Sequence, residues 1–106
     1  MVVKEHFKVG SPLYMPPETL SNSLYSLKTD SFALGVSLFY MLTKRFPWVG
    51  SNDKQLLENY KSNTFPSYLL QNVPLKMKKY IEDLCQLDIN QRILIKDIDN
   101  VIKNPE

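Results

Sequence analysis

Apolar side chains recur every three or four residues along much of this chain, which is the spacing expected for one face of a helix. Over residues 74–85 these positions alternate with lysines and carboxylates on the other face. The same spacing predicts helices over about 53–60 and 95–103, the first capped by a polar residue at 51–53. The chain contains no internal repeat and no convincing strand pair. The pattern therefore predicts an all-α fold.

Residues 30–43 predict a helix with almost no polar face, since only Ser37 and Tyr40 interrupt its apolar positions. The apolar positions are Phe32, Ala33, Leu34, Val36, Leu38, Phe39, Met41 and Leu42. Thr29 or Asp30 is expected to cap the first turn. A helix that is apolar all round must be surrounded by protein, and a domain of this length buries only roughly 60–65% of its unfolded surface. We therefore expect part of its packing partner to come from outside these residues.

The segment before this helix reads as loop with one short helix in it. Residues 1–16 contain one glycine and two prolines and show no sustained period, which favours an extended loop. Pro17 can occupy the first turn of a short helix, because a first-turn N–H has no intrahelical acceptor. Residues 21–23 should end that helix, and a polar loop should continue to about Lys28.

Charge and cysteine content exclude several classes of protein. The 106 residues carry 13 Lys and Arg against 11 Asp and Glu, and a net charge of +2 is too weak to argue for a nucleic-acid or membrane partner. Cys85 is the single cysteine, which rules out an intramolecular disulfide and favours a reducing compartment. The apolar run 32–42 is too short to span a bilayer, and charge interrupts the N-terminus too early for a signal peptide. We expect a cytoplasmic location, with the nucleus as the alternative.

Three motifs, well separated in the chain, agree in order and spacing with one family. Residues 10–18 end in Pro-Pro-Glu, which is similar to the Ala-Pro-Glu triplet that closes an activation segment. Residues 30–35 resemble an Asp-x-Trp-x-x-Gly motif with Phe32 in place of Trp, and residues 87–92 resemble an Asp-Pro-x-x-Arg motif with Ile89 in place of Pro. Together they resemble the C-lobe of a eukaryotic-type Ser/Thr protein kinase domain, from the end of the activation segment onward.

The resemblance implies structural roles for four residues. Glu18 would pair with Arg92 and tie the activation segment to the base of the lobe, a task that suits the planar fork of a guanidinium. The alternative is that both side chains are exposed and unconnected. Asp30 would accept hydrogen bonds from the backbone of the catalytic loop, and Gly35 is the glycine of the same motif.

The resemblance also implies a substrate-binding edge. Ser11 stands where Ser/Thr kinases carry a hydroxyl that contacts the catalytic Asp and Lys. Pro12, Leu13 and Tyr14 would then line the pocket for the substrate residue that follows the acceptor. The alternative is an ordinary Ser-Pro turn.

The groups that perform phosphoryl transfer in this family do not occur in the 106 residues. Transfer needs a glycine-rich loop over the phosphates, a Lys, an Asp that holds Mg²⁺ and a catalytic-loop Asp. The chain contains no Gly-x-Gly-x-x-Gly, His-Arg-Asp or Asp-Phe-Gly sequence. We therefore expect no catalytic residue and no cofactor in this chain, which by itself should be inactive, while ATP and Mg belong to the intact parent kinase.

The sequence thus predicts a single partial kinase domain over residues 1–106. Residues 1–18 would be the end of the activation segment, 30–43 the central buried helix and 53–103 the remaining helices. Its partners would be a protein substrate or the N-terminal portion of the kinase. The alternatives are a non-catalytic helical interaction module derived from a kinase and an unrelated all-α adaptor.

Three further residues have plain interpretations. His6 is expected to be a solvated loop residue, because no second metal ligand lies near it in sequence. Cys85 lies on an apolar helical face and should be a small buried hydrophobe. Trp48 is expected to be a packing residue.

Overall fold

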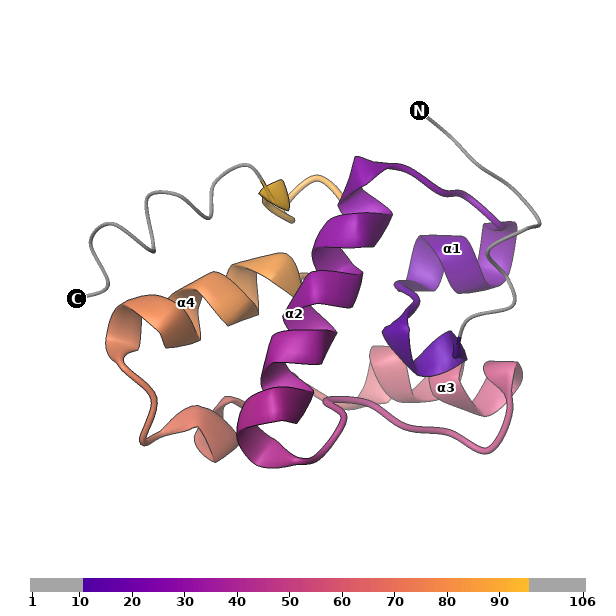
Figure 1. The fold of residues 1–106 in the computed structure, drawn as a ribbon. Helices are drawn as coiled ribbons and strands as arrows, with labels where there is room; N and C mark the ends of the chain where they lie inside the picture. Colours follow the sequence, from indigo (N-terminus) through magenta and orange to yellow (C-terminus); the bar gives the residue numbers. More distant parts are fainter. Residues whose placement is uncertain (1–10, 96–106) are drawn as a thin grey trace.

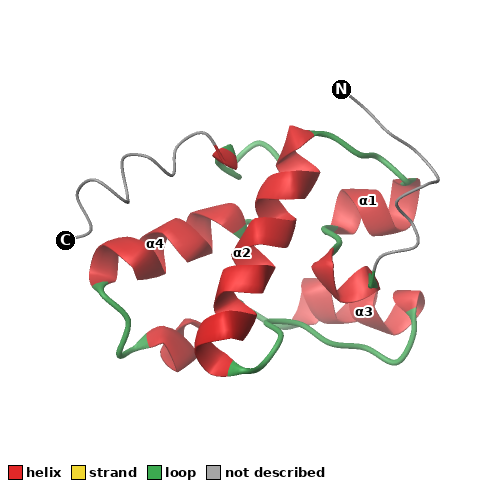
Figure 2. Ribbon diagram, viewed as in Figure 1, coloured by secondary structure: helices red, strands yellow, loops and turns green. Residues whose placement is uncertain are grey.

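The computed structural model describes residues 11–95, and within this range the chain forms helices and loops without a strand (Figure 2). The elements are η2 (Pro12–Tyr14), α1 (Pro17–Asn22), α2 (Leu27–Thr43), α3 (Asp53–Ser62), η3 (Ser67–Leu70) and α4 (Leu75–Leu84). The predicted all-α class is confirmed. His6 and the helix expected over 95–103 lie outside the described residues, apart from Ile95.

Helix α2 lies in the middle of the molecule (Figure 1). Helices α4 and η3 pack on one side of it, and η2, α1 and α3 lie on the other. The face of α2 that meets these neighbours is fully buried at Phe32, Val36 and Phe39. One long apolar helix therefore holds together two groups of short elements that have little contact with each other otherwise.

Helix α2 begins at Leu27, three residues before the start expected from the sequence. Ser26 caps it: the Ser26 hydroxyl accepts from the Lys28 N–H at 3.1 Å, and the Thr29 hydroxyl accepts from the Ser26 N–H at 3.0 Å. The prediction that Thr29 or Asp30 is the cap is wrong. This reciprocal pair satisfies free backbone donors and so fixes the helix start at Ser26.

The C-terminal end of α2 is not enclosed by the described residues. Tyr40, Met41 and Leu42 expose 38%, 66% and 51% of their surface. The described residues thus leave this end of α2 uncovered, and the packing partner expected from outside these residues stays a prediction. An apolar surface of this kind costs free energy in water, since burial of apolar area is favourable by about 25 cal/mol per Å².

Gly35 allows α2 to lie close to α4. A Cβ atom at Gly35 would lie 2.7 Å from the Cys85 Sγ and 2.8 Å from the Leu84 Cβ, closer than atoms of real side chains approach. Cys85 itself is buried, as the sequence predicted. The glycine of the second motif is thus required by helix packing, and its φ angle is not a factor.

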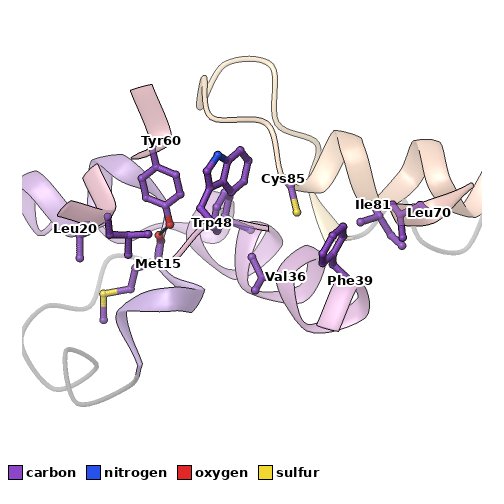
Figure 3. Packing of buried hydrophobic residues seen from close by; sticks show 11 residues of the cluster. Met15, Leu20, Val36, Phe39, Trp48, Tyr60, Leu70, Ile81 and Cys85 are labelled. Carbon is purple, nitrogen blue, oxygen red and sulfur yellow. Dashed lines mark hydrogen bonds between the residues drawn. The ribbon is translucent and has the colours of Figure 1, made fainter. Parts of the chain in front are cut away.

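Aromatic rings fill the core between α2 and α3 (Figure 3). The Trp48 ring is stacked on Phe32 with centroids 6.2 Å apart and meets Tyr60 edge-on at 5.2 Å. The Trp48 indole N–H donates to the Asn63 carbonyl at 2.9 Å. The interpretation of Trp48 as a packing residue is confirmed.

Candidate functional site

The Arg92 side chain is the most completely bound group in the described part of the chain. Its exposed fraction is 1%. Nε donates to the Gln86 carbonyl at 2.8 Å, and Nη2 donates to the Leu87 carbonyl at 3.3 Å. Nη1 donates to the Lys28 carbonyl at 3.0 Å, and the two Nη atoms donate to the two oxygens of Glu18 at 2.7 and 3.1 Å. All five N–H donors of the guanidinium are thus satisfied.

The Glu18–Arg92 ion pair joins two segments that are 74 residues apart in sequence. Glu18 lies in the first turn of α1, where the helix dipole also favours a carboxylate. The pair is bidentate and its Glu18 side chain is only 13% exposed, so water screens it little. The alternative that these two side chains are exposed and unconnected is wrong.

Two further contacts of this site were not expected from the sequence. The Arg92 guanidinium carbon lies 5.2 Å from the centre of the Phe32 ring, which is cation–π distance. The Lys28 ammonium donates to the Ile89 carbonyl at 3.1 Å and also to the Arg92 carbonyl. Lys28 and Arg92 therefore each bind the other's backbone carbonyl. The sequence signal for Lys28 was weak, because it stands in a polar stretch that reads as loop.

The predicted substrate-binding residues form one surface turn. Ser11 caps η2 by accepting from the Leu13 N–H at 3.3 Å, and both Ser11 and Pro12 are exposed. Tyr14 is half-buried and meets the Phe46 ring edge-on at 5.4 Å. The structure thus brings Ser11, Pro12, Leu13 and Tyr14 together, with the Ser-Pro turn as their local geometry. Whether they bind substrate stays a prediction.

The end of this turn is anchored to α3. The Tyr60 hydroxyl donates to the Met15 carbonyl at 2.6 Å, and both residues are buried. Burial raises the pKa of Tyr60 well above its usual value, so the phenol stays protonated and keeps this hydrogen bond. The turn and the Glu18–Arg92 pair are therefore fixed at neighbouring points of one segment.

Asp30 lies apart from these contacts. It is in the first turn of α2 and exposed, and among residues 11–95 no hydrogen bond to its carboxylate is recorded. Its predicted acceptor role toward a catalytic loop stays a prediction. Gly35, from the same motif, serves the packing of α2 on α4 described above.

The Cys85 thiol and the side chains that can bind a metal are further candidates for chemistry in the described range. Burial raises the pKa of the Cys85 thiol far above its usual value, so the thiol is not a nucleophile. No group of three or more His, Cys, Asp or Glu side chains that could hold a metal occurs between residues 11 and 95. In the same range no helix is long and apolar enough to cross a membrane.

The sequence matches the family described as "Protein kinase domain" over residues 3–102. It is 36% identical over 95 residues to the serine/threonine-protein kinase ATG1 of Debaryomyces hansenii, covering 86% of this chain and 11% of that protein. It is 30% identical over 91 residues to the Aurora kinase of Dictyostelium discoideum, covering 86% of this chain and 23% of that one. The chain thus spans between a tenth and a quarter of these relatives.

Solved structures agree with the fold. The crystal structure of the Rad53 kinase domain with SCD2 matches 85% of this chain and 34% of its own, with a TM-score of 0.68 and 24% identity. The twitchin kinase region from C. elegans matches 88% of this chain and 16% of its own, with a TM-score of 0.67. The helical arrangement of residues 11–95 is therefore one that kinase domains contain.

Proposed function

This chain belongs to the protein kinase domain family, of the eukaryotic Ser/Thr type, and we propose that it forms the C-lobe part of such a domain, from the end of the activation segment onward. One observation carries the proposal. The bidentate Glu18–Arg92 pair ties the Pro-Pro-Glu end of residues 10–18 to the loop 87–92. Those are the two ends of the stretch over which the family motifs occur. A buried bidentate pair between them supports the view that both motifs belong to one domain.

In the intact kinase this part would act in the ATP-dependent phosphorylation of protein Ser or Thr. The turn Ser11–Tyr14 would contact the substrate segment, and its attachment through Met15 to Tyr60 supports a fixed docking edge. Asp30 would hold the backbone of the catalytic loop, which accords with its exposed carboxylate.

The 106 residues by themselves would not transfer phosphate, because none of the groups that bind ATP and Mg²⁺ occurs in them. The partner of this part would be the N-terminal portion of a kinase domain, together with a protein substrate. The location would be cytoplasmic, with the nucleus as the alternative.

A chimeric kinase tests the proposal. The 95 residues of the Debaryomyces hansenii ATG1 protein that match this chain are replaced by the corresponding residues of this chain. We expect the chimera to phosphorylate a Ser/Thr peptide with [γ-³²P]ATP, and the 106-residue chain to show neither incorporation nor a thermal shift with Mg-ATP.

The chimera with Leu13→Asp and Tyr14→Asp is the matched variant for the proposed substrate edge. Because both side chains also pack against the core, its thermal unfolding is compared with that of the chimera first. The variant should bind ATP as before but phosphorylate the peptide poorly. A chimera that melts cooperatively and binds Mg-ATP, yet transfers no phosphate, would contradict the proposed role. Activity of the isolated chain would contradict it as well.

A second candidate is a non-catalytic helical interaction module. The exposed side chains of Tyr40, Met41 and Leu42 support it, because contiguous apolar surface is typical of an interface. On this alternative the isolated chain unfolds in one sharp transition, and the chimera is inactive. On the leading proposal the isolated chain melts without cooperativity and tends to aggregate.

A further inference from the structure

A cleft of about 530 Å³ opens between the end of α3 and the end of α4, and none of the four residues of the Ser11–Tyr14 turn lines it. One wall is formed by residues 60–65 and Ser67, the other by Glu82 and residues 85–88. Ligand pockets in proteins typically enclose about 300–1,000 Å³. The cleft is therefore large enough for one or two side chains of a peptide.

The floor of the cleft is aromatic. Trp48, Tyr60 and Phe65 line it, with Trp48 and Phe65 centroids 5.7 Å apart. The polar atoms of two of these rings are already used, since the Trp48 indole N–H donates to Asn63 and the Tyr60 hydroxyl donates to Met15. Trp48 and Tyr60 are buried, whereas Phe65 is half-buried, so Phe65 is the floor ring that has surface left for a ligand.

The rim of the cleft carries two carboxylates, of Glu82 and Asp88, against one ammonium, of Lys61. Within residues 11–95 the ion pairs are Arg92–Glu18 and Lys79–Asp83, so neither rim carboxylate is neutralised there. Glu82 accepts one hydrogen bond from the Ser67 hydroxyl, at 2.5 Å, and Asp88 accepts one from the Asn90 N–H, at 2.9 Å.

These two carboxylates retain acceptor capacity, because an ionised carboxylate has about four lone-pair sites. The local excess of negative charge is notable in a chain whose net charge is +2. The half-buried Phe65 ring and two carboxylates without an ion-pair partner line the same cleft. A guanidinium suits this combination, because it stacks on rings and binds carboxylates through a planar fork.

We propose that the α3–α4 cleft is a docking site for an arginine side chain presented by a flexible segment of a partner protein. The arginine lies over the Phe65 ring and donates to Glu82 and Asp88, and an aliphatic neighbour of the arginine fills the rest of the cleft. The cleft contains no residue of the proposed substrate edge, although Tyr60 on its floor also binds the Met15 carbonyl at the end of that turn. Occupation of the cleft does not depend on phosphoryl transfer.

The test compares three peptides: acetyl-Leu-Arg-Leu-amide, the same peptide with citrulline in place of arginine, and acetyl-Leu-Glu-Leu-amide. Trp48 is the single tryptophan of the chain, so its fluorescence and its indole N–H resonance report on the floor of the cleft. We expect the arginine peptide to change both signals with a Kd of about 1 mM or tighter. The neutral and acidic peptides should bind at least about tenfold more weakly.

Isosteric variants locate the binding. Glu82→Gln and Asp88→Asn keep an acceptor for Ser67 and Asn90 but remove the charge. Each should weaken binding of the arginine peptide about three- to tenfold. Lys61→Gln should strengthen binding of the same peptide. Glu58→Gln removes an exposed α3 carboxylate that does not line the cleft and should leave the Kd unchanged.

The same peptides, labelled with fluorescein, are then measured by anisotropy on the chimeric kinase, so that the outcome does not depend on how well the chain folds by itself. Equal binding of the citrulline peptide, or an arginine-peptide Kd that Glu82→Gln and Asp88→Asn leave unchanged, would overturn the proposal. Tighter binding of the acidic peptide would overturn it too. If the chain associates with itself and Arg45→Gln abolishes that association, the cleft binds Arg45 of a second copy. That result would overturn the assignment to a separate partner.

Discussion

Arg92 and Asp30 come from two motifs of the same family, and the structure treats them in opposite ways. Arg92 is buried and makes five hydrogen bonds to groups of this chain, two of them to Glu18. Asp30 is exposed at the start of α2, with no hydrogen bond recorded to its carboxylate within residues 11–95. The donors of Arg92 are all satisfied inside the described chain, whereas the Asp30 carboxylate has no recorded partner there.

The difference separates two kinds of requirement. A buried guanidinium must find its acceptors within the same structure, because an unpaired charge in the interior costs several kcal/mol. An exposed carboxylate is hydrated by water and needs no partner within the same chain. The Arg92 contacts are therefore part of what folds this stretch, whereas Asp30 is available for the proposed catalytic loop.

The largest effect is expected from breaking the Arg92 contacts. Arg92→Ala leaves the Glu18 carboxylate and three backbone carbonyls without their donor, and should lower the free energy of unfolding by about 3–5 kcal/mol. Arg92→Lys should recover only part of this loss, because an ammonium lacks the planar fork. The measurement is urea unfolding of the chimeric domain followed by far-UV circular dichroism.

A surface ion pair serves as the control for that variant. Lys79 pairs with Asp83 at 3.4 Å, and its side chain is 72% exposed. Lys79→Ala should cost only about 0.3–0.5 kcal/mol. Equal losses for Lys79→Ala and Arg92→Ala would show that burial of the Glu18–Arg92 pair does not matter.

The second expected effect concerns catalysis. Asp30→Asn should change the free energy of unfolding by less than about 1 kcal/mol, since the side chain is exposed in a first helical turn. In the chimera the same change should lower kcat by roughly 100-fold, because misplacing a catalytic loop by about 1 Å costs that much. Steady-state kinetics on the Ser/Thr peptide give the value.

Asp53→Asn is the matched variant, since Asp53 is also an exposed acid in a first helical turn, that of α3. It should leave both stability and kcat as they are. A loss of stability with Asp30→Asn as large as that of Arg92→Ala would remove the distinction between the two regions.

The smallest effect appears only in alkaline solution. Burial raises the pKa values of Cys85 and Tyr60 above their ordinary values of 9.0 and 10.0. Above pH 9 the unfolded chain releases these protons while the folded chain keeps them, so stability is full below that pH and falls as the pH rises. Cys85→Ala should remove the loss of stability that begins near pH 9 and leave the loss that begins near pH 10. Urea unfolding at pH 7, 9, 10 and 11 measures it, and an unchanged slope in the variant would contradict the assignment.

Much of the helical framework followed from local sequence. Pro17 starts α1, Asn52 caps α3, and the loop 87–92 follows α4, all as the pattern predicted. The start of α2 did not follow, because Ser26 and Thr29 exchange hydrogen bonds that a polar stretch does not announce. Helix periodicity locates the middle of a helix better than its first turn.

The contacts at Arg92 divide in the same way. The pairing with Glu18 was implied by motifs that resemble a known family, and not by spacing alone. The reciprocal contact with Lys28 had only a weak sequence signal. The Phe32 ring beside the guanidinium and the carbonyls of Gln86 and Leu87 had none. These groups depend on how the loop after α4 passes the start of α2.

By itself, the sequence determined the all-α class, most helix positions and the apolar character of the central helix, because side-chain periodicity and proline placement act locally. Only the tertiary structure decided that Met41 and Leu42 stay exposed, that Gly35 admits Cys85, and that a cleft opens between α3 and α4. The physical reason is that burial and close approach depend on side chains contributed by distant segments, and their positions are fixed only when the helices pack.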